Sequence, residues 1–145
     1  MSILPQILIL SSDLKSRVDL TRILERLGQE SITAPTLGKC REILVRKDVG
    51  LVFCDRDLED GDYRDVLVMT ACKFAKGKAR VVLTYSLTEP HEYQQAKSFG
   101  VLDIIATPCR PADVEWMVIL ARRDACKGAL ASVESRKAAL HRANL

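Results

Sequence analysis

Short apolar runs alternate with longer amphipathic stretches along this chain of 145 residues. The run at positions 51–54 is apolar throughout, which is typical of a parallel strand buried on both faces. In the longer stretches, apolar residues recur three and four positions apart, and this spacing predicts helices with one buried face. The expected strands are 7–10, 31–34, 51–54, 80–84 and 101–106. The expected helices are 14–27, 37–47, 63–74, 89–99 and about 112–143.

Polar residues and glycines mark the ends of these predicted elements. Either Ser12 or Asp13 is placed to cap the first helix, and Gly28 is placed to end it. Five strands that alternate with helices predict a single α/β domain with a parallel sheet, because right-handed crossovers place helices on both faces. We assign this domain to residues 1–124.

The last predicted helix is longer than a domain of this size needs. Its first half, around Trp116, is apolar enough to pack on the sheet, and we expect Trp116 to be a buried anchor. Farther along, Ile119, Cys126, Val133 and Leu140 recur every seven residues. The extension at 125–145 is therefore a frayed end, a homodimerisation stalk or a connection to another domain.

Composition narrows the class of protein. Charged residues make up 28% of the chain and apolar residues 48%, which fits a soluble globular domain. The net charge of +3 is too small to imply a nucleic-acid binder by itself, and nucleic acid is not the expected partner. The five cysteines lack zinc-type or redox-type spacing and are expected to be buried in a reducing compartment. No stretch is long enough to span a membrane, so a cytoplasmic protein is expected.

The most informative residue for function is Asp55, which closes the third predicted strand. Open α/β sheets place their sites at the carboxyl ends of strands. Asp57, Glu59, Asp60 and Asp62 follow closely. Asp55 is thus a candidate nucleophile, metal ligand or phosphoryl acceptor, and the alternative is a solvated acidic loop.

Three segments in order carry a resemblance to a known family. They are DRDLEDGDY from Asp55, VVLTYS with Thr84, and GVLDIIATP from Gly100. Residues 4–122 resemble the receiver domain of two-component response regulators. The resemblance implies a three-layer flavodoxin-like fold of five strand–helix units, with an extended C-terminal helix here. It also implies that a histidine kinase phosphorylates Asp55 and that Thr84 is the switch hydroxyl.

The chain departs from the family at the positions that do the chemistry. Ser11 and Ser12 stand where the family keeps an acidic pair that holds a divalent cation, and Asp13 comes one residue later. Thr107 replaces the lysine that pairs with the phosphoryl group. The expected pocket around Asp55 consists of Ser11, Ser12, Asp13, Asp57, Tyr85 and Thr107. Within it, Asp55 and Asp13 would bind Mg²⁺ only weakly, and Tyr85 could cover Asp55.

These departures favour a degenerate receiver, or pseudo-receiver, that is not an enzyme. It would signal by protein–protein interaction with a histidine kinase or another signalling protein. Its expected interaction face contains His91, Tyr93, Gln94, Lys97, Val101 and Ile104. Trp116 is a further candidate for this face, although burial in the core is the favoured expectation for it. Ile104 stands where the family has its switch aromatic.

Two alternatives remain open at the level of sequence. One is a phosphorylation-competent receiver that uses Asp55 as its acceptor. The other is a flavodoxin-like module that binds a nucleotide or flavin phosphate at the SSDLKS turn, where serine hydroxyls meet a helix N-terminus. The Thr107–Pro108 bond is a candidate for the cis form.

Overall fold

A five-stranded, fully parallel sheet forms the centre of the computed structural model, which describes residues 6–72, 79–85 and 90–123. The strand order is β2-β1-β3-β6-β7. The strands are β1 (Gln6–Leu10), β2 (Ser31–Ala34), β3 (Val49–Asp55), β6 (Arg80–Thr84) and β7 (Asp103–Ile105). The helices are α1 (Leu14–Arg26), α2 (Leu37–Arg46), α3 (Tyr63–Ala71), α4 (Pro90–Phe99) and a C-terminal helix at 111–123. The predicted α/β class and parallel sheet are confirmed.

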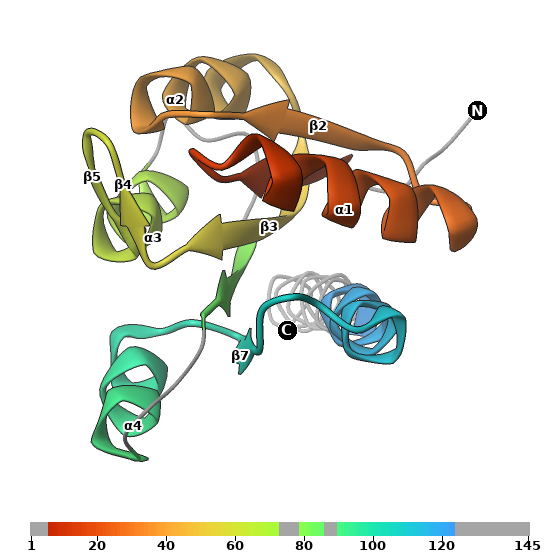
Figure 1. Cartoon of the computed structure of the whole chain (residues 1–145). Helices are drawn as coiled ribbons and strands as arrows, with labels where there is room; N and C mark the ends of the chain where they lie inside the picture. Colours follow the sequence, from red (N-terminus) through yellow and green to blue (C-terminus); the bar gives the residue numbers. More distant parts are fainter. Residues whose placement is uncertain (1–5, 73–78, 86–89, 124–145) are drawn as a thin grey trace, which may run out of the picture.

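Helices cover both faces of the sheet, so the domain has three layers (Figure 1). On β1, Ile7 and Ile9 pack with α1 and the C-terminal helix, whereas Leu8 and Leu10 pack with α2, α3 and α4. All four side chains are buried, because successive residues of a strand point to opposite faces and both faces are covered. This double burial explains the unbroken apolar runs in the sequence.

The ends of α1 settle which residues cap it. Asp13 is the N-cap, and its carboxylate accepts from the backbone N–H and the hydroxyl of Ser16 at 3.2 and 2.8 Å. At the other end, Gly28 has a φ of 75° and donates to Glu25, while the N–H of Gln29 bonds the carbonyl of Leu24. This is a Schellman motif, so Gly28 ends the helix as predicted.

Several predicted boundaries were wrong by a few residues. The fifth strand spans only Asp103–Ile105, because the Val101 N–H bonds the Ala96 carbonyl of α4 and the Leu102 N–H makes a single bond to the Val81 carbonyl of β6. Within the expected acidic loop, two very short strands, β4 (Asp57–Leu58) and β5 (Gly61–Asp62), form an antiparallel hairpin. Two-residue strands are too short to give a readable alternation of apolar and polar residues.

The C-terminal helix packs on the sheet, but not through its tryptophan. Val114, Met117 and Val118 are buried against the face that also contacts α1. Trp116 lies on the opposite side and is 48% exposed, so its prediction as a buried anchor was wrong. The guanidinium of Arg123 lies 5.9 Å from its ring centroid. The predicted extension at 125–145 and the repeat beyond Ile119 lie outside the described residues.

No helix among the described residues is both long enough and apolar enough to cross a membrane.

Candidate functional site

Asp55 lies at the carboxyl end of the central strand, where the ends of β1 and β6 meet it. Ser11 directly follows β1, and Thr84 is the register partner of Asp55 on β6. The hydroxyl of Ser11 donates to Asp55 Oδ2 at 2.6 Å, and the hydroxyl of Thr84 donates to Asp55 Oδ1 at 3.1 Å. Each carboxylate oxygen of Asp55 therefore has a hydroxyl partner.

The Ser11 hydroxyl is held in place from several directions. Its side chain is buried, and its oxygen accepts from the backbone N–H of Asp13 at 3.1 Å. Of the two acceptors within reach of the hydroxyl proton, Asp55 Oδ2 at 2.6 Å is much nearer than the Asp13 carbonyl at 3.4 Å. The backbone carbonyl of Ser11 also accepts from the guanidinium of Arg17 at 2.6 Å. Ser11 is thus a fixed donor to Asp55.

The half-buried position of Asp55 shifts its protonation. Burial raises the pKa of Asp55 above its ordinary value of 3.8, since the charged form loses solvation. The bonds from Ser11, Thr84 and the Ser12 backbone lower the pKa, and the nearby charge of Asp13 raises it. Burial is the largest of these effects, so the folded protein disfavours the carboxylate.

Replacing Asp55 with asparagine is therefore expected to stabilise the fold at neutral pH. A group whose pKa is raised by folding stabilises the fold below its unfolded pKa and loses that contribution as pH rises through its folded pKa. The advantage of Asp55→Asn should thus be present at pH 7 and vanish as pH falls towards 3.8. Urea unfolding of both proteins across this pH range tests it. Lower stability of the variant at pH 7 would mean that the two hydroxyl bonds outweigh the cost of burial.

Two carboxylates of the acidic loop after Asp55 cap the helices α2 and α3. The carboxylate of Asp60 accepts from the backbone N–H groups of Leu37 and Gly38 at 2.9 and 3.1 Å, at the first turn of α2. Asp62 is the N-cap of α3 and forms a capping box with Asp65. These bonds lower the pKa of Asp60, and those to Arg64 lower the pKa of Asp62. Asp60 and Asp62 therefore tie the hairpin to two helices.

Asp60→Ala is expected to lower the free energy of unfolding more than Glu59→Ala, because α2 loses a capping carboxylate. Two backbone N–H groups of α2 would lose their acceptor. Glu59→Ala is the matched control, because Glu59 is an exposed carboxylate of the same loop. Urea unfolding at pH 7 measures both, and equal losses in the two variants would contradict a capping role.

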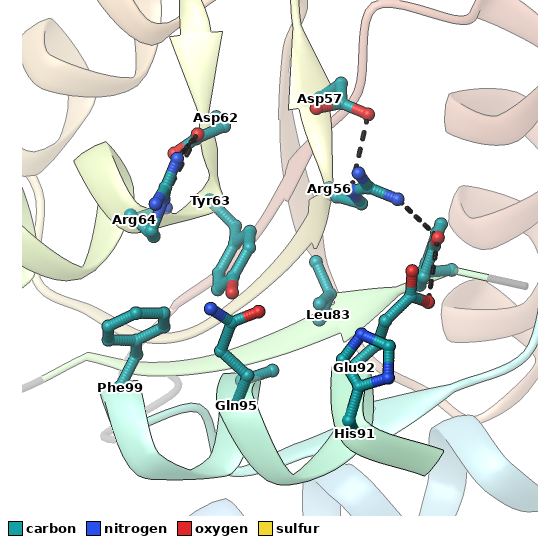
Figure 2. Close-up of a pocket in the computed structure, with 12 residues that line it drawn as sticks. Arg56, Asp57, Asp62, Tyr63, Arg64, Leu83, His91, Glu92, Gln95 and Phe99 are labelled. Carbon is teal, nitrogen blue, oxygen red and sulfur yellow. Dashed lines mark hydrogen bonds and ion pairs between the residues drawn. The ribbon is translucent and has the colours of Figure 1, made fainter. Parts of the chain in front are cut away.

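Asp57 and Tyr85, both predicted to line the Asp55 pocket, lie around a neighbouring cavity of about 220 Å³ (Figure 2). Asp57 is exposed and pairs with Arg56 at 3.6 Å. The hydroxyl of Tyr85 accepts from Arg56 and donates to Glu92 of α4 at 3.1 Å. The Tyr85 hydroxyl is thus bonded to α4, and the covering of Asp55 by the Tyr85 ring stays a prediction. Sequence reasoning missed Arg56 and Glu92, although Arg56 directly follows Asp55.

The residues around Asp55 do not fit a divalent cation well. The carboxylate of Asp13 is directed to Ser16, and Ser11 occupies one oxygen of Asp55. Among the described residues, no group of three or more carboxylate, histidine or cysteine side chains is placed to hold a metal ion. Hard cations such as Mg²⁺ require several oxygen ligands, which this arrangement lacks.

A second cavity of about 250 Å³ lies beside Thr84. Thr107 and the cis-bonded Pro108 line it on one side, and Asp13 and Lys15 line it on the other. The predicted cis bond is confirmed. Asp13 already caps the N-terminus of α1, so a phosphate there would meet a carboxylate, and this disfavours the nucleotide or flavin alternative.

Most residues of the expected interaction face are accessible. His91, Tyr93, Gln94 and Lys97 are exposed on α4, and Ile104 is partly buried on β7. The Tyr93 hydroxyl bonds Asp103 at 3.1 Å, and Lys97 donates to the Leu102 carbonyl at 2.7 Å. Val101 is only 3% exposed, so its place on this face was predicted wrongly.

The buried cysteine beside Asp55 has an unreactive environment. Cys54 is fully buried, and burial raises the pKa of its thiol well above 9.0. The thiol donates to the Asp55 carbonyl at 3.0 Å. A neutral thiol is a poor nucleophile, which agrees with the structural role expected from the sequence.

No protein-family model and no curated protein sequence matches this chain significantly. Solved structures do. A signal receiver domain from Vibrio parahaemolyticus, from a protein described as a Luxo repressor, superposes with a TM-score of 0.77 and 15% identity, covering 88% of this chain and 96% of that one. A CheY-like receiver domain protein from Methanospirillum hungatei has a TM-score of 0.72 and 19% identity, covering 86% and 98%.

A third similar structure is a Burkholderia pseudomallei response regulator, solved with a phosphorylated aspartic acid, a calcium ion and citrate. Its TM-score is 0.67 at 16% identity, with 88% of this chain and 74% of that chain covered. Identities this low establish architecture, not chemistry. The chain has the flavodoxin-like fold of response regulator receiver domains.

Proposed function

We propose that this chain is a receiver-like signalling module that works mainly by protein–protein interaction, without efficient phosphoryl transfer to Asp55. The observation that carries the proposal is the Ser11–Asp55–Thr84 cluster, in which both carboxylate oxygens already accept hydroxyl bonds. The hydroxyl bond at 2.6 Å stabilises the negative charge on Asp55 Oδ2, which makes that oxygen a weaker nucleophile towards a phosphoryl group.

Electrostatics opposes phosphorylation further. Two like unit charges 4 Å apart repel by about 4 kcal/mol at an effective dielectric constant near 20. If no cation offsets that repulsion, the reaction slows by about a thousandfold. In this chain Ser11, Ser12 and Thr107 stand in place of the groups that would supply or hold positive charge.

The partner of such a module would be a histidine kinase or another signalling protein. Its docking face would combine exposed α4 residues with the C-terminal helix, where Trp116 is 48% and Ile119 is 37% exposed. Exposed aromatic side chains of this kind are common anchors in protein interfaces. A homodimer through the C-terminal helix belongs to the same proposal.

Intact-mass analysis after incubation with Mg²⁺ and acetyl phosphate tests the proposal. We expect no phosphoryl adduct on the wild-type chain, and the same mass for Asp55→Ala. A receiver domain with an intact acidic pair and lysine serves as the positive control, so that a short-lived acyl phosphate would be detected under identical conditions. An adduct on the wild type that Asp55→Ala abolishes would establish the phosphorylation-competent alternative instead.

A further inference from the structure

The residues that directly follow β3 and β6 form a second contact beyond the ends of these strands. Asp55 and Thr84 are register partners at the ends of β3 and β6, and their side chains bond at 3.1 Å. One position farther along, the guanidinium of Arg56 donates to the hydroxyl of Tyr85. Because Arg56 and Tyr85 are covalently joined to Asp55 and Thr84, we expect a change in the first pair to alter the spacing of the second.

Tyr85 extends this contact to α4. Its hydroxyl proton goes to Glu92 Oε2 at 3.1 Å, so donors and acceptors run in one direction from Arg56 through Tyr85 to Glu92 (Figure 2). Glu92 lies in the first turn of α4. Hydrogen bonds arranged in series polarise one another, so that the Arg56–Tyr85–Glu92 series responds as a unit.

Two further contacts of Arg56 keep its guanidinium beside Tyr85. Its guanidinium carbon lies 4.9 Å from the centroid of the Tyr85 ring, and its Nε lies 3.6 Å from Asp57. The Tyr85 ring itself packs against the buried cluster that includes Leu83 and Ala96. The partly buried tyrosine ring gives the exposed arginine a cation–π partner in addition to its hydrogen bond.

The geometry points to Arg56 and Tyr85 as positioning residues that couple the Asp55–Thr84 pair to the first turn of α4. This inference rests on the proposed function in one respect, that α4 faces the partner. Strand β7 has Ile104 where an aromatic residue would otherwise follow the switch hydroxyl, so the tyrosine beside Thr84 provides a different route.

The bonds between α4 and the β7 side of the sheet provide an internal control. Tyr93 bonds Asp103, and Lys97 donates to the Leu102 carbonyl, and both partners belong to β7 or its preceding loop. These bonds do not include Asp55, Thr84 or their neighbours. Tyr93→Phe therefore removes a tyrosine hydroxyl bond between α4 and β7 and leaves the Arg56–Tyr85–Glu92 bonds unchanged. It is the same chemical change as Tyr85→Phe.

Hydrogen–deuterium exchange of peptides spanning α4 tests the coupling in the isolated chain. Thr84→Val removes the hydroxyl that bonds Asp55 at nearly constant volume, and we expect it to raise α4 exchange about fivefold, the effect of one neutral hydrogen bond. The same response should persist in Tyr93→Phe and disappear in Tyr85→Phe. Arg56→Lys, which keeps a donor, should retain part of the response, and Arg56→Met should abolish it.

A second trigger variant and a check of folding complete the exchange experiment. Asp55→Asn serves as a second trigger if Thr84→Val does not fold, and circular dichroism confirms that every variant is folded. An equal response to Thr84→Val in Tyr85→Phe and in the wild type would overturn the coupling. So would the absence of any α4 response to both triggers. Since neither phosphodonor nor partner is present, these outcomes do not depend on whether Asp55 can be phosphorylated.

Discussion

Gly61→Ala is expected to lower the free energy of unfolding by about 2 kcal/mol, through lost packing and backbone strain. Gly61 lies in the hairpin between two helix-capping aspartates, with a φ of 156°. A Cβ atom there would clash with Asp65 Oδ2 and Leu37 Cδ1. Either neighbour can move only at a cost, because Asp65 completes the capping box of α3 and Leu37 is buried against the sheet.

Gly28→Ala separates packing from strain. Gly28 also has a positive φ, 75°, but a Cβ atom there meets no atom within 4 Å. We expect this variant to lose only about 1 kcal/mol, the cost of a left-handed conformation for alanine. Urea unfolding of both variants measures the difference. If Gly61→Ala costs no more than Gly28→Ala, the hairpin is not packed against α2 and α3 as described.

The strands and helices could be predicted because most residues that are buried in the fold are apolar in the sequence. Ile7 to Leu10 are all apolar since alternate residues enter the two cores, and the apolar spacing in α1 matches Leu20 and Leu24, which are buried. Trp116 could not be placed in this way. In an amphipathic helix an aromatic residue can lie on the buried face or on the exposed face. Here the buried face is formed by the neighbouring valines and methionine, which leaves the tryptophan exposed.

The site was predictable as a location but not as a set of contacts. Asp55 and Thr84 follow buried strands, so their meeting at the sheet edge follows from topology. The loop carboxylates were harder, because a run of aspartates predicts a metal site as readily as a pair of helix caps. What distinguishes Asp60 is its bond to backbone N–H groups 22 and 23 residues earlier in the chain, a contact that only the fold creates.

The second large effect is expected when the two serines after β1 are replaced by acids. Ser11→Asp combined with Ser12→Asp would place two more carboxylates beside the half-buried Asp55. Without a divalent cation these groups repel, and Ser11 no longer donates to Asp55, so we expect about 2–4 kcal/mol less stability in EDTA. The wild type should be indifferent to EDTA.

Added Mg²⁺ should reverse this loss in the double variant alone. A site with a Kd of about 1 mM would gain about 1.4 kcal/mol at 10 mM Mg²⁺, which thermal unfolding resolves as a shift of several degrees. The matched control adds Asp55→Asn to the two substitutions and should weaken the response, because it removes one carboxylate from the set. Equal stabilisation of the wild type by Mg²⁺ would contradict the prediction, since it would mean that Asp55 and Asp13 already suffice to bind the cation. The comparison therefore measures how much of the affinity for Mg²⁺ depends on the residues at positions 11 and 12, and how much on the rest of the pocket.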